Sequence, residues 1–263
     1  FVATVMPGLL LASIYVGYII VRCQLNPELG PPAPLEERQL PREEKLRLII
    51  GLSLPLGVAA SVLGSIYLGI ASVTEAAGMG ALGAIISAGV RRELSWTMLR
   101  EALYQTMNTC GMLLWITFGA TALIGIYNRM GGDTFVEGLI TDLPLGPLAI
   151  IVVMMAILII LGMFMDWIGI CLLTMPIFVP VVITLGYNPI WFGILFCMNM
   201  QISYLTPPFG PAAFYLKGVA PPGIELGHIY NAMWPFIALQ ACGLVLVLFF
   251  PEIALWLPAQ LRN

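Results

Sequence analysis

Long apolar stretches separated by short charged clusters are the main pattern of this chain. Seven long stretches carry no Asp, Glu, Lys or Arg: 1–21, 48–74, 76–90, 102–128, 143–165, 167–216 and 226–251. A helical bilayer crossing takes about 20 apolar residues, so a chain of this length has room for about six to eight crossings. The pattern therefore predicts an all-α integral membrane protein.

Polar clusters set the expected limits of the helices. The divisions, in order, are a transmembrane helix at 1–21, an inner loop at 22–47, three transmembrane helices (scaffold and arm) at 48–128, an outer loop at 129–144, a region of interrupted helices at 145–217 and a last transmembrane helix at 229–257. The proline-rich loop 22–47 holds five of the eleven Lys and Arg residues. Since Lys and Arg are enriched on the cytoplasmic side, that loop is expected inside and the C-terminus outside.

Composition agrees with a membrane location and excludes several functions. Hydrophobic residues make up 60% of the 263 residues and charged residues 10%, and the mean hydropathy is +0.96. A net charge of −3 argues against a nucleic-acid binder, and a single histidine excludes a multi-histidine metal site. The first apolar run begins at residue 1 without an initiating Met, so we expect a fragment of a longer protein.

Asp166 is the first place where the sequence departs from a plain lipid-facing helix. A carboxylate within an apolar stretch is costly unless it faces water or an ion, so it is a candidate site residue. The flanks 145–162 and 167–183 are each short for a crossing, and Gly162 precedes the acid by four positions. We expect a re-entrant helical hairpin over 145–186 with its tip at 162–166. The alternative is that Asp166 ends two ordinary crossings at the inner surface.

A proline cluster at 206–211 interrupts the next apolar stretch. Its sequence is Thr206-Pro207-Pro208-Phe209-Gly210-Pro211. Proline lacks a donor N–H and clashes with the preceding turn, so the helix at 191–217 should break here. Broken helices at membrane depth occur where the freed carbonyls line a cavity, although a simple proline kink is the alternative.

The segment around Glu75 has a simpler explanation. Ser72 or Thr74 can cap a helix that starts near Glu75, and the carboxylate suits the positive end of that helix. Three glycines give this helix a small face for close packing: Gly78, Gly80 and Gly83. Capping and packing account for these residues, and a ligand role is the alternative.

At these positions the chain resembles the large membrane subunit of tripartite ATP-independent periplasmic (TRAP) transporters. The matching elements are Gly69-Ile70-x-x-x-Thr74-Glu75-Ala76-Ala77, then Gly162-x-x-x-Asp166 with Pro176 and Pro180, then Asn199 and Thr206-Pro207-Pro208-x-Gly210. Their order and spacing match across nearly the whole chain. The family's first repeat is missing, so the resemblance covers the C-terminal half, with 1–21 as the helix that closes the absent repeat.

The resemblance implies half of an inverted-repeat, elevator-type, sodium-coupled transporter in the bacterial inner membrane, with a periplasmic C-terminus. It also implies a small membrane subunit, a periplasmic binding protein that delivers an organic acid, the missing N-terminal half and lipid as partners. No cofactor is expected other than Na⁺ as coupling ion. Since half of the site is missing, the 263 residues alone should not transport.

The hairpin tip and the break are expected to hold one sodium ion between them. The expected ion ligands are Gly162 and Phe164 through carbonyl oxygens, Asp166 through its carboxylate, and Thr206 and Gly210 from the break. The expected substrate-side residues are Asn199, Pro207, Pro208 and Phe209. Sodium is a hard cation and prefers such oxygen ligands.

Two other classes of function compete with transport. A transporter half could serve as a structural or assembly subunit of a larger membrane complex, and a co-purified first repeat would argue against that reading. An integral-membrane enzyme is disfavoured, because one histidine and two deep carboxylates form no catalytic constellation.

Overall fold

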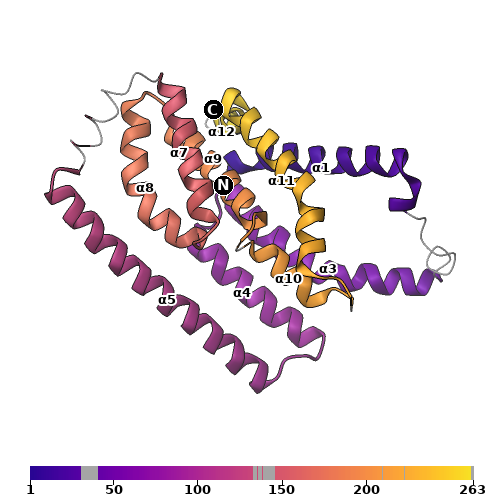
Figure 1. The fold of residues 1–263 in the computed structure, drawn as a ribbon. Helices are drawn as coiled ribbons and strands as arrows, with labels where there is room; N and C mark the ends of the chain where they lie inside the picture. Colours follow the sequence, from indigo (N-terminus) through magenta and orange to yellow (C-terminus); the bar gives the residue numbers. More distant parts are fainter. Residues whose placement is uncertain are drawn as a thin grey trace. The chain divides into compact units, whose positions relative to one another are not determined.

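The computed structural model describes residues 1–30, 41–132, 146–208, 210–221 and 223–261, together with Phe135 and Gly138. For Leu29, 42–50 and Leu261 it describes the backbone alone. Within these ranges all regular elements are helices (Figure 1). The expectation of an all-α protein is therefore confirmed for the described part of the chain.

Five of the described helices are long and apolar enough to cross a membrane. They are Val2–Leu25, Val73–Val90, Trp96–Arg129, Trp167–Thr184 and Leu226–Phe249. Three shorter apolar helices lie at Gly51–Tyr67, Pro147–Gly162 and Pro189–Leu205. This set of helices makes the chain a multi-pass membrane protein by length and composition.

The chain divides into two compact units, each described here by itself. Unit 1 comprises Phe1–Val21 and Gly111–Asn263, and unit 2 comprises Arg22–Cys110. Helix α5 (Trp96–Arg129) begins in unit 2 and ends in unit 1, and none of its residues is buried.

Unit 2 is built on a helical hairpin of α3 (Arg42–Tyr67) and α4 (Val73–Val90). The two helices approach closely because α4 offers glycines. A Cβ atom added to Gly80 would lie 3.1 Å from Val62 Cγ2, and one added to Gly83 would lie 2.9 Å from Val58 Cγ2. The predicted small face is therefore confirmed at these two glycines, whereas Gly78 has no such neighbour within 4 Å.

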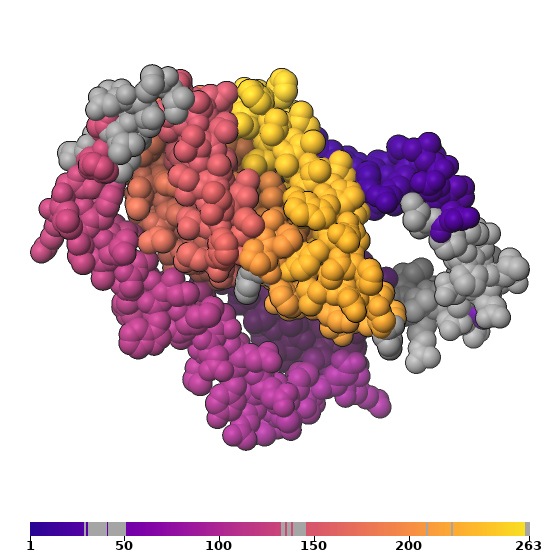
Figure 2. Space-filling view, in the orientation of Figure 1, coloured from indigo at the N-terminus to yellow at the C-terminus, as the bar shows by residue number. Residues whose placement is uncertain are grey.

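Unit 1 is organised around α9 (Pro189–Leu205). This helix packs against α7 (Pro147–Gly162), α8 (Trp167–Thr184), α10 (Pro211–Val219), α11 (Leu226–Phe249), α12 (Glu252–Leu261) and the short 3-10 helix η1 (Val2–Thr4). Its side chains Trp191, Phe192 and Leu195 are fully buried. The Trp191 Nε1–H also donates to the Val247 carbonyl at 2.8 Å. Figure 2 shows α7 to α12, coloured from rose to yellow, as closely packed atoms.

Helix α1 (Val5–Leu25) lies in unit 1 up to Val21, and this part contacts α11. A side chain at Gly243 of α11 would overlap the Leu11 side chain of α1, so the two helices approach at a glycine. Tyr15 and Tyr18 of α1 both make edge-on contacts with the Phe236 ring of α11, with ring centroids 5.4 and 5.6 Å apart. These contacts pack α1 against α11.

The structure differs from the sequence-based limits at three places. Helix α1 continues to Leu25, and α3 begins at Arg42, so both extend into the expected loop 22–47. The single last helix expected at 229–257 is wrong, because α11 ends at Phe249 and α12 follows from Glu252. Pro251 explains this division, since proline disfavours a helical conformation of the preceding residue.

Candidate functional site

The tip of the α7–α8 hairpin is a four-residue turn at 163–166. Helix α7 ends at Gly162, and the Met163 and Met165 N–H groups donate back to its last carbonyls. Asp166 is the N-cap of α8, where its carboxylate accepts the Ile168 N–H at 3.1 Å. Figure 1 shows α7 and α8 side by side, as a hairpin requires. The acid therefore has a structural role at the turn and remains solvent-exposed.

Several carbonyl oxygens at this turn have no partner among the described residues. No described N–H or side-chain donor reaches the Gly162, Met163 or Phe164 carbonyls. They are the unsatisfied acceptors that any helix C-terminus leaves. Since such carbonyls carry a negative partial charge, the turn has oxygens to offer a cation.

The break between α9 and α10 forms where the prolines predict it. Helix α9 ends at Leu205 and α10 begins at Pro211. Gly210 adopts a positive φ of 29°, a conformation that other residues rarely take. Its N–H donates to the Thr206 carbonyl at 3.1 Å, and the buried Thr206 hydroxyl donates to the Ile202 carbonyl at 2.7 Å.

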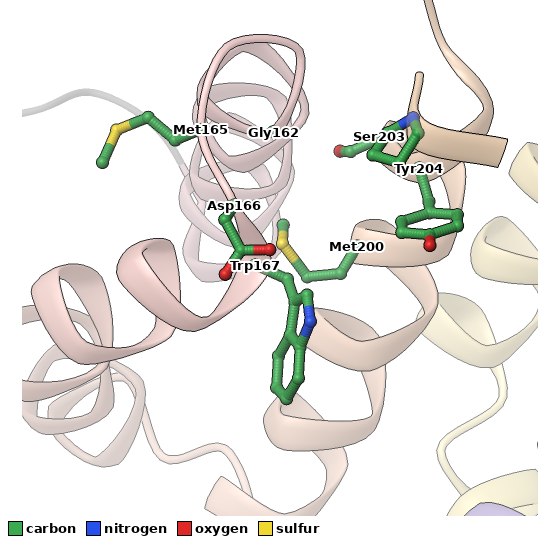
Figure 3. Close-up of a pocket in the computed structure, with 8 residues that line it drawn as sticks. Gly162, Met165, Asp166, Trp167, Met200, Ser203 and Tyr204 are labelled. Atoms are coloured by element: carbon green, nitrogen blue, oxygen red, sulfur yellow. The ribbon is translucent and has the colours of Figure 1, made fainter. Parts of the chain in front are cut away.

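A small cavity lies where the hairpin tip meets the broken helix. Its volume is about 10 Å³, close to the smallest space that can hold one water molecule. The described residues that line it are Gly162, Met165, Asp166, Trp167, Met200, Ser203, Tyr204 and Pro211. Figure 3 shows Asp166 and Trp167 of the hairpin opposite Ser203 and Tyr204 of the broken helix.

Four helix ends meet at this cavity. Gly162 is the last residue of α7 and Trp167 is the first of α8. Ser203 and Tyr204 lie in the last turn of α9, and Pro211 is the first residue of α10. The cavity is therefore bounded by two helix C-termini and two helix N-termini, which carry partial charges of opposite sign.

Only some of the expected ion ligands lie at the small cavity. Gly162 and Asp166 line the cavity, whereas Thr206 and Gly210 lie in the adjoining break and do not line it. The Phe164 side chain is 68% exposed and has no polar atom. Only the backbone carbonyl of this residue could therefore be an ion ligand. Among the described residues no three His, Cys, Asp or Glu side chains form a metal-binding group.

Asn199, which is predicted to lie on the substrate side, is buried between α9 and α7. Its side chain is fully buried, and its Nδ2 donates to the Met155 carbonyl of α7 at 2.8 Å. Its Oδ1 has no partner among the described residues. Asn199 thus holds α9 against α7 in this structure. Pro207 and Pro208 lie at the break, and Phe209, the remaining substrate-side prediction, lies outside the described residues.

Sequence reasoning missed the face of α9 that completes the cavity. Met200, Ser203 and Tyr204 line it together because residues three and four apart share one face of a helix. Ser203 is a polar residue close to the break, but the sequence alone assigns it no role. Its contact with Gly162 across two helices gives no signal in the sequence.

A second polar feature of unit 1 joins three helices. The Tyr15 hydroxyl of α1 donates to Gln240 Oε1 of α11, and Gln240 Nε2 donates to Gln201 Oε1 of α9 at 2.6 Å. Gln240 is buried. All three residues also line a larger, mostly apolar cavity of about 830 Å³ beside α8 and α9.

The segment around Glu75 forms the capping box that its sequence predicts. The Glu75 N–H donates to Ser72 Oγ at 3.3 Å, and the Ser72 N–H donates to Glu75 Oε2 at 2.8 Å. Ser72, rather than Thr74, is the N-cap of α4. Each residue satisfies a backbone donor that the helix start would leave free.

Comparison with known proteins places this arrangement in a family. The family model described as "Tripartite ATP-independent periplasmic transporter, DctM component" matches residues 1–253. The match includes the hairpin, the break and all the residues that line the small cavity. The chain belongs to the DctM family.

Individual relatives of this DctM-family chain are named as permeases. It is 30% identical over 261 residues to the C4-dicarboxylate TRAP transporter large permease protein DctM of Pseudomonas aeruginosa, covering 98% of this chain and 59% of the relative. It is 32% identical over 202 residues to the isethionate TRAP transporter permease protein DctMQ of Oleidesulfovibrio alaskensis, covering 76% and 32% respectively. It is 27% identical over 261 residues to the sialic acid TRAP transporter large permease protein SiaM of Vibrio cholerae, covering 98% and 59%.

Two facts follow for the DctM-family chain. It is related to transporter permeases and not to enzymes. It also spans about three fifths of the length of the DctM and SiaM relatives. The resemblance to part of a TRAP large subunit, predicted from its motifs, is therefore confirmed.

Proposed function

We propose that this chain is part of a sodium-coupled permease that takes up an organic acid across the bacterial inner membrane. The meeting of four helix ends at one small cavity carries this proposal. Since the chain spans about 59% of the relatives' length, transport is a property of the whole permease.

The oxygens at the hairpin tip suit a sodium ion. The Gly162 and Phe164 carbonyls have no described hydrogen-bond donor, and the Asp166 carboxylate adjoins them with one described partner, the Ile168 N–H. The Thr206 hydroxyl and the Gly210 carbonyl complete the proposed ligand set from the break; the Gly210 carbonyl also accepts the Ala213 N–H at 2.9 Å. A site at two helix C-termini also favours a cation, as in other transporters with broken helices.

The length of α7 supports a re-entrant hairpin. At 1.5 Å per residue, the 16 residues of α7 span about 24 Å, less than the about 30 Å hydrocarbon core of a bilayer. A turn inside the membrane would place Asp166 and the break at similar depth. The hairpin would then belong to one repeat of an elevator-type transporter, with the C-terminus on the periplasmic side.

The solute and the partners are inferred from the family. The relatives' names refer to C4-dicarboxylates, isethionate and sialic acid. The N-termini of α8 and α10 at the cavity would favour the negative group of such a solute. Pro207, Pro208 and Phe209 would line that side. The proposed partners are the rest of the large subunit, the small membrane subunit, a periplasmic binding protein and surrounding lipid.

Uptake into proteoliposomes tests this function. The complete permease with its partners is reconstituted, and solute uptake is measured against the sodium gradient for the wild type, Asp166→Asn and Glu252→Gln. Glu252 is an exposed acid at the start of α12, so it serves as the matched control. We expect Asp166→Asn to lower sodium-driven uptake at least about tenfold, a loss of about 1.4 kcal/mol, with the control unchanged.

Two results would overturn the proposal. Unchanged sodium dependence of uptake in Asp166→Asn would show that this carboxylate is not part of the ion site. Absence of uptake by the wild-type complex, with assembly intact, would favour a structural or assembly subunit instead.

A further inference from the structure

The break between α9 and α10 is tied to a third helix by one side chain. The Tyr230 hydroxyl of α11 donates to the Pro208 carbonyl at 3.2 Å. The other described bonds of the break are local. The Thr206 N–H and hydroxyl donate to the Ser203 and Ile202 carbonyls, the Gly210 N–H donates to the Thr206 carbonyl, and the Ala213 N–H donates to the Gly210 carbonyl. Tyr230 is therefore the described side chain through which α11 contacts the backbone of the break by a hydrogen bond.

The Tyr230 ring also occupies the space beside Gly210. A Cβ atom added to Gly210 would lie 3.0 Å from Tyr230 Cε1 and 3.3 Å from its hydroxyl oxygen. Gly210 has a positive φ as well, so both its conformation and its contact with the ring require the absence of a side chain. The ring and the hydroxyl thus contact two positions of the same short segment.

Tyr230 itself is held in place by the start of α11. The Lys217 ammonium group of α10 donates to the Ile224 carbonyl, and the Glu225 N–H donates to His228 Nδ1 at 3.2 Å. Ile229, next to Tyr230, is buried. These bonds hold the start of the helix from which the Tyr230 side chain extends to the break.

We infer that Tyr230 is a positioning residue that sets the backbone conformation of the break and, through it, the sodium affinity of the site. This inference rests on the proposed function, in which Thr206 and Gly210 contribute ligands. Tyr230 itself is not among the proposed ligands. Its hydroxyl donates to the Pro208 carbonyl and so restrains the backbone of the break at this residue.

Removing the hydroxyl should weaken sodium binding without abolishing transport. Tyr230→Phe keeps the ring beside Gly210 and loses the bond to Pro208. A neutral hydrogen bond has a net value that corresponds to about a fivefold change in an equilibrium constant. In the reconstituted complete permease, we expect the sodium concentration for half-maximal uptake to rise about fivefold, with the maximal rate within about twofold of wild type.

Tyr187→Phe is the matched control. Tyr187 precedes the start of α9, at the end of the helix away from the break. Its ring stacks on that of Trp191, with ring centroids 5.1 Å apart. Like Tyr230→Phe, Tyr187→Phe removes a phenol hydroxyl, but at a position away from the break. The control should leave the sodium dependence at its wild-type value.

Hydrogen exchange gives a readout that does not depend on sodium coupling. In Tyr230→Phe, the amide of Gly210, measured in peptides covering 206–215, should exchange several times faster than in the wild type and in Tyr187→Phe. Gly210→Ala is a second variant, since its methyl group would press on the Tyr230 ring and should produce the same two changes.

The outcomes separate this inference from the proposed function. Faster exchange together with weaker sodium affinity supports the inference. Unchanged hydrogen exchange at the Gly210 amide overturns the inference, whatever the sodium affinity of the variant. Faster exchange with unchanged sodium affinity also overturns it, because the break would then move without affecting the site. Sodium-independent uptake by the wild type would instead defeat the proposed function on which the inference rests.

Discussion

Gly162 at the end of α7 lies directly against Ser203 of α9, so closely that a methyl group at 162 would overlap the serine Cβ and Oγ atoms. Both residues line the small cavity. The hairpin tip is therefore held at its distance from the broken helix by the absence of a side chain. Glycine is required here for close approach between helices, in addition to its position at a helix end.

Substituting Gly162 should push the hairpin away from α9. We expect Gly162→Ala to lower the free energy of unfolding by about 1–3 kcal/mol, as overpacking does elsewhere, and to reduce sodium-dependent uptake strongly. Thermal melting of the purified protein and proteoliposome uptake measure the two effects. Gly193→Ala is the control, because no atom lies within 4 Å of the added methyl group.

The double variant Gly162→Ala, Ser203→Gly should recover part of both losses, since it exchanges which helix carries the side chain. A double variant as impaired as Gly162→Ala alone would mean that the contact with Ser203 is not the cause.

The broken helix should matter more for ion binding than for folding. Replacing Pro207 and Pro208 by Ala restores N–H donors and recovers up to about 3 kcal/mol of helix preference per proline. We expect the variant to fold, with sodium affinity weakened at least about tenfold, equivalent to about 1.4 kcal/mol. Sodium titrations of uptake measure this. Pro258→Ala in α12 is the control. Wild-type sodium affinity in the double variant would show that the proline cluster only kinks the helix and does not form an ion site.

The depth of the hairpin tip can be measured by chemical labelling. The five native cysteines (Cys23, Cys110, Cys171, Cys197 and Cys242) are replaced, and single cysteines are introduced at 163–166. If 145–186 is re-entrant from the outer side, these cysteines should label poorly from the cytoplasm in the outward-facing state. Ready labelling from the cytoplasm would show two complete crossings, the alternative that the sequence leaves open.

The capping box of α4 should contribute stability rather than ion binding. Ser72→Ala removes the acceptor for the Glu75 N–H, and the loss of an N-cap costs about 1 kcal/mol. We expect a lower melting temperature with unchanged sodium dependence. Ser61→Ala, which loses only a bond to the Val58 carbonyl, is the control. Weaker sodium affinity at unchanged stability would assign Glu75 a ligand role.

Features that depend on near neighbours in the chain were predictable from the sequence. The break at 206–211 follows from the chemistry of proline, and the Ser72–Glu75 capping box follows from residues three positions apart. The turn at Asp166 was predicted for the same reason. The division at Pro251 was equally local, but the uninterrupted apolar composition around it suggested one helix through 257.

Features that depend on which face of a helix is buried were not predictable. Most residues of α9 are apolar, so no 3.6-residue pattern shows which of its faces packs against α7. Asn199 was therefore placed on the substrate side, although it lies against α7. The lining of the cavity depends on how α7 and α9 cross, which the sequence of either helix alone does not specify.

The bond between Tyr15 and Gln240 has a consequence for biosynthesis. These residues are 225 positions apart, so α1 enters the membrane about 10 to 45 s before its partner is synthesised, at about 5–20 residues per second. During that interval the Tyr15 hydroxyl has to find a temporary partner, such as water or a lipid headgroup, because an unsatisfied polar group in hydrocarbon is costly. The order of membrane insertion thus leaves the docking of α1 until after α11 has left the ribosome.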